Sequence, residues 1–563
     1  MVRRIKQRES NKDVYESCIY AGYPEIIARI IAGRISVFDK NLFDLSIGAI
    51  KPALEMAGAE PAVTRIAEAV NNNQTILIFT DYDVDGCTSM AVLYKALHEV
   101  FNVPASSLIS LTGHRVDDGY GLTETVAERI VEIHPDLVIT ADAGISDQNR
   151  IEMLSNAGID VIVTDHHLIP FDGIPGSAVA VVNPCQDNCP YDSKIAGCGV
   201  AWLLMTAAAV HMGCSHDQKV HLHEMLDYVA LGTVADMVSL DSPTNRYFVR
   251  KGLEFMNMKN RPCWNVSIGD KQAGVGDLGF QIGPRINASS RITGRADTAV
   301  DFLLTDDFSS ADALYGELSN HNSNRQSIEN KMISMAENQA AFNQEPALVV
   351  YNDDNHPGTQ GVVASKISER FGIPSIMLAP VNDDIVVGSG RAGQFLHIHK
   401  ALQDLDRAAP GLMISFGGHR AAAGLKLHRR DVDTFKQQFC RIVKDQLKGI
   451  DLTPYTSVDG SLKGLISFDM YSQIERLMPF GIGFPTPVFC DDMQVHEVRV
   501  MGRHPVHLAL KLDEYDAVYF YALKEPGASW PINVGDRGTF TYTLNLNHWN
   551  GVDRLQLVIR DII

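Results

Sequence analysis

The sequence lacks an apolar run long enough to cross a membrane. The longest one, VAWLLMTAAAV at residues 200–210, is shorter than the roughly 20 apolar residues of a transmembrane helix and predicts a buried helix instead. The N-terminus, MVRRIKQRES, is basic but has no apolar segment of the kind that signal peptides contain. Both absences favour a protein of the cytoplasm with no membrane partner.

Cysteine is also scarce. The nine cysteines among 563 residues are scattered and show no spacing typical of a disulfide scaffold. Cys185 and Cys189 could supply half of a zinc site, but no second pair lies at zinc-ligand spacing. We therefore expect reduced, mostly buried thiols rather than disulfides or structural zinc.

Positive charge is in short supply, with 49 Lys and Arg against 68 Asp and Glu and a net charge of −19. Because phosphate contacts require Lys and Arg, this balance argues against a general nucleic-acid coat, although it leaves room for a local basic channel. A hydrophobic content of 45% with 21% charged residues is typical of a soluble globular protein, and the length predicts several domains. No internal repeat or low-complexity tract is evident.

Three short apolar segments are each followed by residues that can bind a metal. TILIFT precedes Asp81, LVITA precedes Asp142, and VIVT precedes Asp165, His166 and His167. Helical patterns lie between these segments, so the sequence predicts a parallel, doubly wound α/β sheet. Right-handed crossovers bring the carboxyl ends of such strands to one edge, where ligands of α/β sheets bind. We therefore expect these residues to form one site.

The first of the three apolar segments is followed by three carboxylates. In the stretch TDYDVDGCTS, Asp81, Asp83 and Asp85 occupy every second position. In an extended strand the three side chains would point the same way. Like charges so close together resist ionisation unless a cation lies among them. A solvated acidic turn is the alternative reading. The apolar strand before it and the helical pattern after it, which Thr88 or Ser89 can cap, favour a cation site.

The donor types indicate which cation would bind. Carboxylates with one or two imidazoles suit Mn²⁺ or Mg²⁺ better than zinc, which favours Cys and more His. Asp236, isolated among apolar residues in VALGTVADMV, is a further candidate ligand. So many carboxylates suggest two ions that share ligands, an arrangement that activates water for in-line attack at phosphorus. Phosphoester hydrolysis is therefore the predicted reaction class.

Three further motifs carry the cations and accessible amides that a phosphate requires. GPRINASSR supplies Arg285 and Arg291 around a turn of small residues, GSGR supplies Ser389 and Arg391 in a flexible glycine-framed loop, and FGGH places His419 after two glycines. Arg binds phosphate through paired hydrogen bonds, and Gly lets backbone amides approach it closely. We expect these motifs to form a substrate-binding region that faces the metal site.

The second half of the chain predicts further elements. Residues 306–342 have the length and apolar spacing of one long connecting helix. ALVVY at 347–351 opens a second α/β region, and the last hundred residues contain short strands between Gly, Pro and Asn turns. That last pattern is typical of a small β-barrel or sandwich.

Together these motifs resemble the DHH phosphoesterase superfamily and, within it, the bacterial RecJ single-strand-specific exonucleases. The resemblance extends from about residue 20 to the C-terminus. Its motifs, in chain order, are DYDVDG (81–86), DGYGL (118–122), TADAGIS (140–146), TDHH (164–167), GTVADMV (232–238), PRINASSR (284–291), HPGTQGVVASK (356–366), GSGR (388–391) and FGGHRAAAG (416–424). Ala143, Ser289, Ser290 and Thr359 depart from the residues usual in the family, but none of these changes removes a candidate ligand.

The resemblance implies a site for two Mn²⁺ or Mg²⁺ ions. The implied metal set comprises Asp81, Asp83, Asp85, Asp142, His166 and Asp236. The residues implied in catalysis are Asp83, Asp85, His167 and Arg285. Asp81 and His167 would support the direct ligands, and Arg285 would stabilise charge at the scissile phosphate.

The resemblance also implies that the GSGR and GGH motifs bind phosphate and that Ser389 and Arg391 hold the 5′ end of the strand. Tyr120 would guide the strand by stacking on a base, with a packed turn aromatic as the equal alternative. The substrate-binding residues expected on this basis are Arg115, Tyr120, Asn287, Arg291, Ser389, Gly390, Arg391, Gly417, Gly418 and His419.

The implied architecture is an α/β protein with a parallel-sheet DHH catalytic domain, a long connecting helix, a second α/β (DHH-associated) domain and a C-terminal OB-like β-barrel. The expected segments are an N-terminal extension (1–45), the catalytic domain (46–305), the connecting helix (306–345), the DHH-associated substrate-binding domain (346–450) and an OB-fold-like nucleic-acid-binding domain (451–563).

The implied activity is 5′→3′ hydrolysis of single-stranded DNA to 5′-mononucleotides in DNA recombination and repair. The resemblance favours a monomer that works beside a single-strand-binding protein and a helicase. One alternative is a DHH enzyme for short oligonucleotides or cyclic dinucleotides, which usually lacks the C-terminal β module. Another is a non-catalytic nucleic-acid-binding protein, as in relatives that have lost ligands, but every candidate ligand position here is filled.

Overall fold

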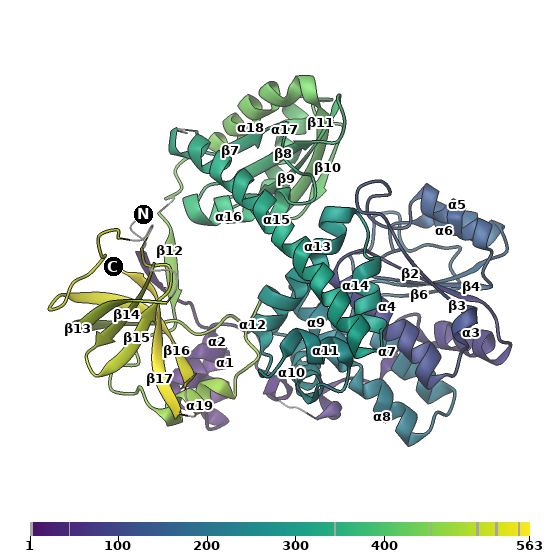
Figure 1. Ribbon diagram of the computed structural model, residues 1–563, viewed down its shortest axis with the longest axis horizontal. Coiled ribbons are helices and arrows are strands. Elements are labelled where there is room, and N and C mark those ends of the chain that lie inside the picture. Colours follow the sequence, from purple (N-terminus) through teal and green to yellow (C-terminus); the bar gives the residue numbers. More distant parts are fainter. Residues whose placement is uncertain are drawn as a thin grey trace. The chain divides into compact units, whose positions relative to one another are not determined.

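The computed structural model describes residues 4–43, 46–187, 189–342, 345–451, 453–502, 506–523, 527–549 and 552–563. Residues 44–45, where the predicted N-terminal extension ends, lie outside the described residues. The chain forms two compact units (Figure 1). The smaller comprises Met1–Ile50, Met237–Arg250 and Thr453–Ile563, and the larger comprises Lys51–Asp236 and Lys251–Leu452.

The larger unit begins with a five-stranded sheet whose neighbouring strands are all parallel, which confirms the predicted α/β sheet. Its strands, in spatial order, are β3 (Leu108–Thr112), β2 (Ile76–Thr80), β4 (Leu137–Ala141), β5 (Asp160–Thr164) and β6 (Ala180–Val182). Every residue of β2 and β4 is buried, because helices cover both faces of the sheet.

The helices on the two faces differ in character. One face packs against the amphipathic helices α5 (Glu124–Ile133) and α6 (Gln148–Asn156). The other face packs against α3 (Ala59–Asn71), α4 (Val84–Lys95) and α7 (Gly197–His211). α7 is apolar all round and almost wholly buried, as predicted for the apolar run at 200–210. Among the described residues, no helix is both long and apolar enough to span a membrane.

Further helices complete this half of the larger unit. They are α8 (His216–Glu224), α9 (Leu226–Ala235), α11 (Pro262–Ile268), α12 (Val275–Asp277), α13 (Gly283–Thr293) and α14 (Asp297–Leu304), with α10 (Pro243–Met258) preceding α11. The residues of PRINASSR lie in α13, so the predicted turn is wrong there. Pro284 stands in the first turn of the helix, where a missing amide hydrogen costs no hydrogen bond.

A single long helix, α15 (Phe308–Phe342), confirms the predicted connecting helix. Its first half packs on α11, α13 and α14. Its second half packs on α16 (Gln360–Phe371), where Met332 and Ala336 enter the hydrophobic core of the second α/β region. α15 therefore joins the two halves of the larger unit by contributing to the packing of both.

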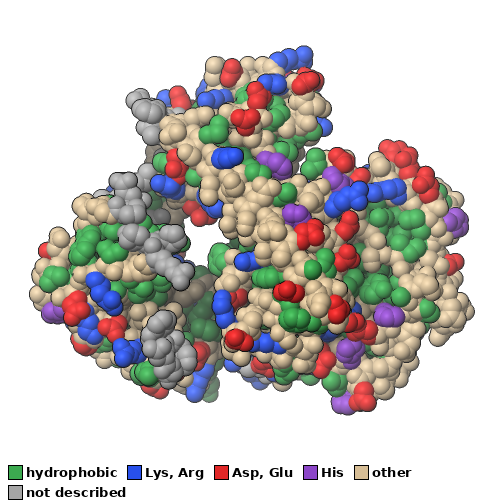
Figure 2. All heavy atoms as spheres, in the orientation of Figure 1, with side chains coloured by type: hydrophobic (Ala, Val, Ile, Leu, Met, Phe, Trp, Pro, Cys, Tyr) green, Lys and Arg blue, Asp and Glu red, His purple; other side chains and the backbone are tan. Residues whose placement is uncertain are grey.

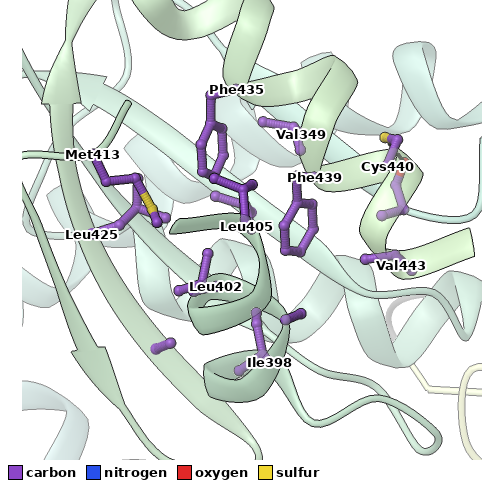
Figure 3. Packing of buried hydrophobic residues seen from close by; sticks show 14 of the residues in the cluster. Val349, Ile398, Leu402, Leu405, Met413, Leu425, Phe435, Phe439, Cys440 and Val443 are labelled. Carbon is purple, nitrogen blue, oxygen red and sulfur yellow. Dashed lines mark hydrogen bonds between the residues drawn. The ribbon is translucent and has the colours of Figure 1, made fainter. Parts of the chain in front are cut away.

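The second α/β region has a mixed five-stranded sheet. Its strands, in spatial order, are β10 (Ser415–Gly418), β11 (Ala422–His428), β9 (Ile385–Arg391), β8 (Ser375–Pro380) and β7 (Leu348–Tyr351). Figure 3 shows part of its core, where Phe435 and Phe439 of α18 (Val432–Gln446) pack against Leu402 and Leu405 of α17 (Ile398–Ala408). GSGR forms the end of β9 rather than the predicted flexible loop, because the strand is hydrogen-bonded on both edges.

The smaller unit contains the C-terminal β-barrel and the first helices of the chain. The barrel strands are β13 (Phe489–Met501), β14 (His507–Leu512), β15 (Tyr515–Tyr519), β17 (Val552–Ile562) and β16 (Arg537–Trp549), and β16 pairs with β13 again. This confirms the predicted OB-like barrel. Its companions are α1 (Lys12–Tyr20), α2 (Glu25–Ala32), α19 (Phe468–Glu475) and the parallel pair β1 (Arg4–Gln7) and β12 (Tyr455–Val458).

A buried ion pair ties the two ends of the chain together inside the smaller unit. The Arg34 guanidinium donates to both carboxylate oxygens of Asp459, at 2.7 and 2.9 Å. Both side chains are almost fully buried, so loss of one partner would leave an uncompensated charge. The N-terminal helices are therefore an integral part of the unit that holds the barrel.

Candidate metal centre

The predicted metal-binding residues meet at the carboxyl edge of the parallel sheet. Asp81 follows β2, Asp142 follows β4, and His166 lies two residues beyond β5. Asp236 reaches the same place from the C-terminal end of α9. Three groups of side chains have donor atoms within 4.8 Å of one another, namely Asp81, Asp83 and Asp142; Asp85, His166 and Asp236; and Asp142, His166 and His167.

The three crowded aspartates reach the centre in a way that differs from the prediction. β2 ends at Thr80 and α4 begins at Val84, so the aspartates do not alternate along one strand. Asp83 is the N-cap of α4, where its Oδ1 accepts hydrogen bonds from the amides of Asp85 (2.9 Å) and Gly86 (3.2 Å). Thr88 does not cap the helix, since its hydroxyl donates to Val84 O inside it.

Asp85 is held in place by backbone amides. Its Oδ2 accepts from the Gly197 amide at 2.6 Å and its Oδ1 from the Cys198 amide at 2.9 Å. These amides open α7, where the helix dipole favours negative charge. A Cβ on Gly197 would lie 2.8 Å from the Asp142 Cβ, and one on Gly232 would lie 2.8 Å from the Asp85 Oδ1. The two helices can approach the carboxylates only because these positions are glycine.

His166 lies between carboxylates from three elements. Its Nε2 is 3.1 Å from Asp142 Oδ1 and 3.7 Å from both Asp85 Oδ2 and Asp236 Oδ2. Asp142 has a left-handed backbone with φ of 57°. Such a conformation is uncommon outside glycine and tends to persist at functional sites.

Asp165 organises the two histidines; the sequence placed it at this strand end but assigned it no role among the metal, catalytic or substrate-binding residues. Its buried Oδ1 accepts from the amides of His166 (2.7 Å) and His167 (3.1 Å) and from His167 Nδ1 (2.8 Å). Its Oδ2 accepts from the Ile145 amide at 3.0 Å. The sequence did carry a signal for this residue, because Asp165 directly follows a strand just as Asp81 and Asp142 do.

Four carboxylates of the centre, those of Asp81, Asp83, Asp142 and Asp236, resist ionisation. Burial, and then the charges of neighbouring aspartates, raise the pKa of Asp81 and Asp142 well above the usual value. The same two causes raise the pKa of Asp83, and they raise that of Asp236 to about 8. A divalent cation among these oxygens would relieve the repulsion. The donor set of carboxylates and imidazole therefore fits Mn²⁺ or Mg²⁺.

The histidines differ in charge. Burial lowers the pKa of His166, which favours the neutral imidazole that a metal ligand requires. Burial acts on His167 in the same sense, but its hydrogen bond to Asp165 and the charge of Asp165 raise the pKa to about 9. Burial alone would raise the pKa of Asp165, and the hydrogen bond and charge of His167 bring it below its usual value. His167 and Asp165 therefore form an ion pair beside the metal ligands.

Two predicted cationic residues lie next to the acidic cluster. The Arg115 guanidinium stacks over Tyr82 at 4.8 Å, and its charge offsets part of the rise that burial and neighbouring aspartates cause in the pKa of Asp81 and Asp83. Arg291 Nη1 donates to Gly358 O at 2.8 Å. Burial, and then the charge of Arg115, lower the pKa of Arg291 to about 9. Both cations are thus placed where a phosphate could enter beside the metal ligands.

Tyr120 is tied to the centre through its hydroxyl. The hydroxyl lies 3.1 Å from His167 Nδ1 and donates to Asp142 O at 3.3 Å, and the ring meets His167 edge-on. About half of the side chain is exposed (49%). The residue is therefore neither a packed turn aromatic nor free of the metal centre.

In the described part of the chain, the hydrogen bonds and ring contacts of Arg285 and Asn287 on α13 do not involve the metal-binding residues. The Arg285 guanidinium donates to Gln281 O and Ser319 Oγ and stacks over Tyr315 at 5.5 Å. The role predicted for it at the scissile phosphate stays a prediction. The buried Asn287 Oδ1 has no hydrogen-bond partner among the described residues.

The predicted 5′-end anchor lies on the second sheet. Arg391 Nη1 donates to Ser389 Oγ at 3.3 Å, and both side chains leave the same face of β9, on either side of Gly390. A Cβ on Gly361 of α16 would lie 3.1 Å from Ser389 Oγ and 3.2 Å from Arg391 Nη2.

The GGH motif lies on the edge of this sheet. Gly417 and Gly418 end β10 and His419 follows in the turn, all three exposed. Figure 2 shows acidic, basic and histidine side chains intermixed on the visible face, in keeping with local rather than general positive charge.

Three family models match the chain. The DHH family N-terminal domain matches residues 75–233, the DHHA1 domain matches 344–445, and the RecJ OB domain matches 459–561. They follow one another along the chain in the order metal centre, second α/β region and barrel.

Curated relatives match the chain along its whole length. The single-stranded-DNA-specific exonuclease RecJ of Salmonella typhimurium is 32% identical over 583 residues, covering 100% of this chain and 99% of the relative. The RecJ of Escherichia coli K12 is 33% identical, with 96% of each chain covered. That of Thermus thermophilus is 31% identical over 88% of this chain and 70% of the relative.

Solved structures agree with these relatives. RecJ from Thermus thermophilus in complex with Mn²⁺ superposes with a TM-score of 0.81 and 26% identity, covering 100% of this chain and 80% of that one. An exonuclease RecJ bound to manganese gives a TM-score of 0.61 and 30% identity, over 72% of this chain and 99% of that one.

Proposed function

The chain belongs to the RecJ family of single-stranded-DNA-specific exonucleases, and from that premise we propose that it degrades single-stranded DNA from the 5′ end to 5′-mononucleotides. The observation that carries the proposal is that five aspartates and two histidines gather at the carboxyl edge of the parallel sheet. They come from the ends of β2, β4 and β5 and from the helices α4 and α9. This donor set is complete in the present chain, which supports an active enzyme rather than a binding protein alone.

The metal-dependent chemistry rests on a centre for two Mn²⁺ or Mg²⁺ ions. Asp81, Asp83 and Asp142 would hold one ion, and Asp85, His166 and Asp236 the other. When bound, such a pair supplies an activated water and positive charge beside the phosphate. The amides of α7 and the helix cap at Asp83 hold the ligands in place before any substrate arrives.

Asp165 and His167 provide fixed charge at the rim of the centre. Asp165 accepts a hydrogen bond from His167 Nδ1–H, which orients the ring and raises the pKa of His167 to about 9. The other ring nitrogen, Nε2, is then a charged donor that can bind a phosphate oxygen. We assign His167 this role in stabilising the reacting phosphate, together with the guanidinium groups of Arg115 and Arg291.

The strand is bound beyond the centre by the second α/β region. Ser389 and Arg391 would hold the 5′ end, and the exposed amides of Gly417 and Gly418 with His419 would bind the next phosphates. Tyr120 would guide the strand past the centre, and Arg285 and Asn287 would contact it from α13. The OB barrel would bind the single-stranded DNA that remains to be degraded, on the 3′ side of the cut.

The setting of the activity is the finer part of the proposal. The enzyme would act as a monomer in the cytoplasm, in DNA recombination and repair. A helicase would supply single strands, and a single-strand-binding protein would cover them.

The test is digestion of a long single-stranded DNA, the matching duplex and a dinucleotide, each with Mn²⁺ or Mg²⁺, followed by sizing of the products. The proposal predicts that the long single strand is degraded to mononucleotides while the blunt duplex persists. Cleavage of the dinucleotide alone would contradict it and would favour an enzyme for short substrates.

A further inference from the structure

A buried charge network lies on α15, outside the metal centre. The Glu329 side chain is fully buried (0% exposed). Its Oε1 accepts from Arg325 Nη1 at 2.5 Å, and its Oε2 accepts from Lys366 Nζ at 3.0 Å. Asn322 Oδ1 holds the other side of the Arg325 guanidinium at 2.7 and 3.2 Å. A buried carboxylate with two cationic partners is costly to disturb, because removing any partner leaves charge uncompensated.

The network ties α15 to α16 of the second α/β region. Arg325 and Glu329 lie on α15, which packs against α13 with its first half, whereas Lys366 lies on α16 of the second α/β region. α15 packs against α13, the helix that carries Arg291. The helix that carries the network therefore also supports the helix of the cation that borders the metal centre.

The segment 358–361, which leads into the first turn of α16, connects α13 with the predicted 5′-end anchor. Gly358 O accepts from Arg291 at 2.8 Å, and Thr359, fully buried, donates its hydroxyl to Met332 Sδ of α15 at 3.2 Å. Gly361, in the first turn of α16, packs against Ser389 and Arg391 so closely that an added Cβ would touch both. One end of the segment thus touches the metal-side cation, and the other touches the predicted 5′-end anchor.

We propose that Glu329 is a positioning residue that fixes the spacing between the metal centre and the 5′-end anchor, and thereby sets how many nucleotides each cut removes. The inference rests on the proposed function. With a 5′ phosphate held at Ser389 and Arg391, only one phosphodiester bond lies at the metal ligands. Glu329 keeps this spacing because it binds Lys366 on the helix that carries Gly361, while its own helix, α15, packs against α13. Arg325, on the same helix, neutralises the buried carboxylate.

Glu329→Gln tests the assignment, because it keeps the size of the side chain and removes its charge. Glu337→Gln is the matched control. Glu337 lies on the same helix and pairs with Arg370 on the same α16, but Arg370 is 62% exposed, whereas Glu329 is fully buried. The probe is a 5′-phosphorylated single-stranded oligonucleotide with a 5′ radiolabel, digested with Mn²⁺ and sized at single-nucleotide resolution.

The wild type and Glu337→Gln should release labelled mononucleotide. Glu329→Gln should release labelled di- and trinucleotides, with their ratio to mononucleotide raised by about tenfold or more, and the rate of mononucleotide release should fall by roughly 10- to 100-fold. A role in stability alone would lower the rate without lengthening the products. Product length therefore separates positioning from folding.

Lys366→Met provides a second variant that removes only the α16 side of the network, at a residue whose side chain is half exposed (49%). It decides the matter should Glu329→Gln fail to fold. Longer products from either variant support the assignment, and mononucleotides alone from every folded variant overturn it. If the wild type releases no mononucleotide from the 5′ end, the proposed function itself fails, and the inference fails with it.

Discussion

At the residue scale, the centre is a set of carboxylates that repel one another unless a cation binds among them or some of them are protonated. Asp83 illustrates this, because one of its oxygens caps α4 while its charge adds to the repulsion on Asp81 and Asp142. Backbone amides hold Asp83 and Asp85 in place, and Gly197 and Gly232 let the neighbouring helices approach the carboxylates closely. Metal binding and rigidity are therefore two consequences of the same residues.

Asp83→Ala should abolish Mn²⁺-dependent nucleotide release while DNA binding is largely kept. Loss of several kcal/mol of charge stabilisation corresponds to a decrease of roughly 1,000-fold or more in rate. Rates are measured on labelled single-stranded DNA, and binding by fluorescence anisotropy with a chelator present. The control is Asp172→Ala, an exposed carboxylate on the loop that follows the histidines, which should leave both unchanged. Undiminished hydrolysis by Asp83→Ala would show that Asp83 is not a metal ligand of the active centre.

Asp165→Asn should lower the rate by about 10- to 100-fold, as is typical when a group that orients a metal-site residue is altered. It should also change the pH profile. The pKa of His167 is about 9 because of Asp165, so the wild type should keep the protonated form up to about pH 9. In the variant the alkaline loss of activity should move to lower pH. An unchanged profile of rate against pH would show that the His167 charge is not needed.

The metal-free protein should lose stability as the pH rises. The pKa of Asp236 is about 8 in the folded chain against 3.8 for an unperturbed carboxyl, so the folded state binds the proton more tightly. The resulting stability is complete below pH 3.8 and disappears as the pH rises through 8. Denaturant melts of chelator-treated protein between pH 5 and 8 measure it, each pKa unit being worth about 1.4 kcal/mol. Mn²⁺ at pH 8 should restore stability, and Asp236→Asn should flatten the dependence.

At the scale of elements, the strand ends were the most predictable part of the site. Runs such as ILIF and VIV are buried on both faces of a parallel sheet, and such strands carry their polar residues at the ends. Asp81, Asp142 and His166 could therefore be placed from local sequence. The helix caps and packing glycines could not, because they depend on which helices meet. Gly197 and Cys198 bind Asp85 from 112 and 113 residues away.

The same reason explains the errors on the substrate side. Gly388 and Gly390 suggested a flexible loop, yet β9 is paired with β8 and β11, and large apolar side chains fill the space over both glycines. The glycines serve close packing rather than mobility. In the same way, Glu329 looked like one more charge on a polar helix, and only the packing of α15 shows that it is buried.

Two glycines in helices should respond in opposite ways to alanine. In Gly232→Ala the new Cβ would lie 2.4 Å from Thr88 Oγ1 and 2.8 Å from Asp85 Oδ1, so α9 must move away from α4 and take Asp236 with it. Mn²⁺ affinity should fall by about 10- to 100-fold. In Gly316→Ala of α15 the Cβ meets nothing within 4 Å, and unfolding should require about 0.5–1 kcal/mol more.

Calorimetry of Mn²⁺ binding and denaturant melts of the two variants make this comparison. Equal metal affinity in Gly232→Ala and the wild type would show that the close approach of α9 and α4 does not shape the centre.

At the scale of the whole molecule, the chain combines a metal centre, a second α/β region and an OB barrel in the order found in its relatives. The first helices share a unit with the barrel, which β1, β12 and the pair of Arg34 with Asp459 hold together. Its net charge of −19 is compatible with DNA binding because Arg115, Arg291 and Arg391 are each placed at a specific site. On the proposed roles of these residues, substrate recognition would depend on local cations rather than on total charge.

The central claim is that the enzyme enters single-stranded DNA at the 5′ end and removes one nucleotide at a time. The most direct measurement is a time course of digestion with Mn²⁺ on one oligonucleotide labelled in separate preparations at the 5′ or the 3′ end. The account predicts that the 5′ label appears at once as mononucleotide, whereas the 3′ label passes through progressively shorter strands. Early release of the 3′ label as mononucleotide, or of internal fragments from both preparations, would contradict it.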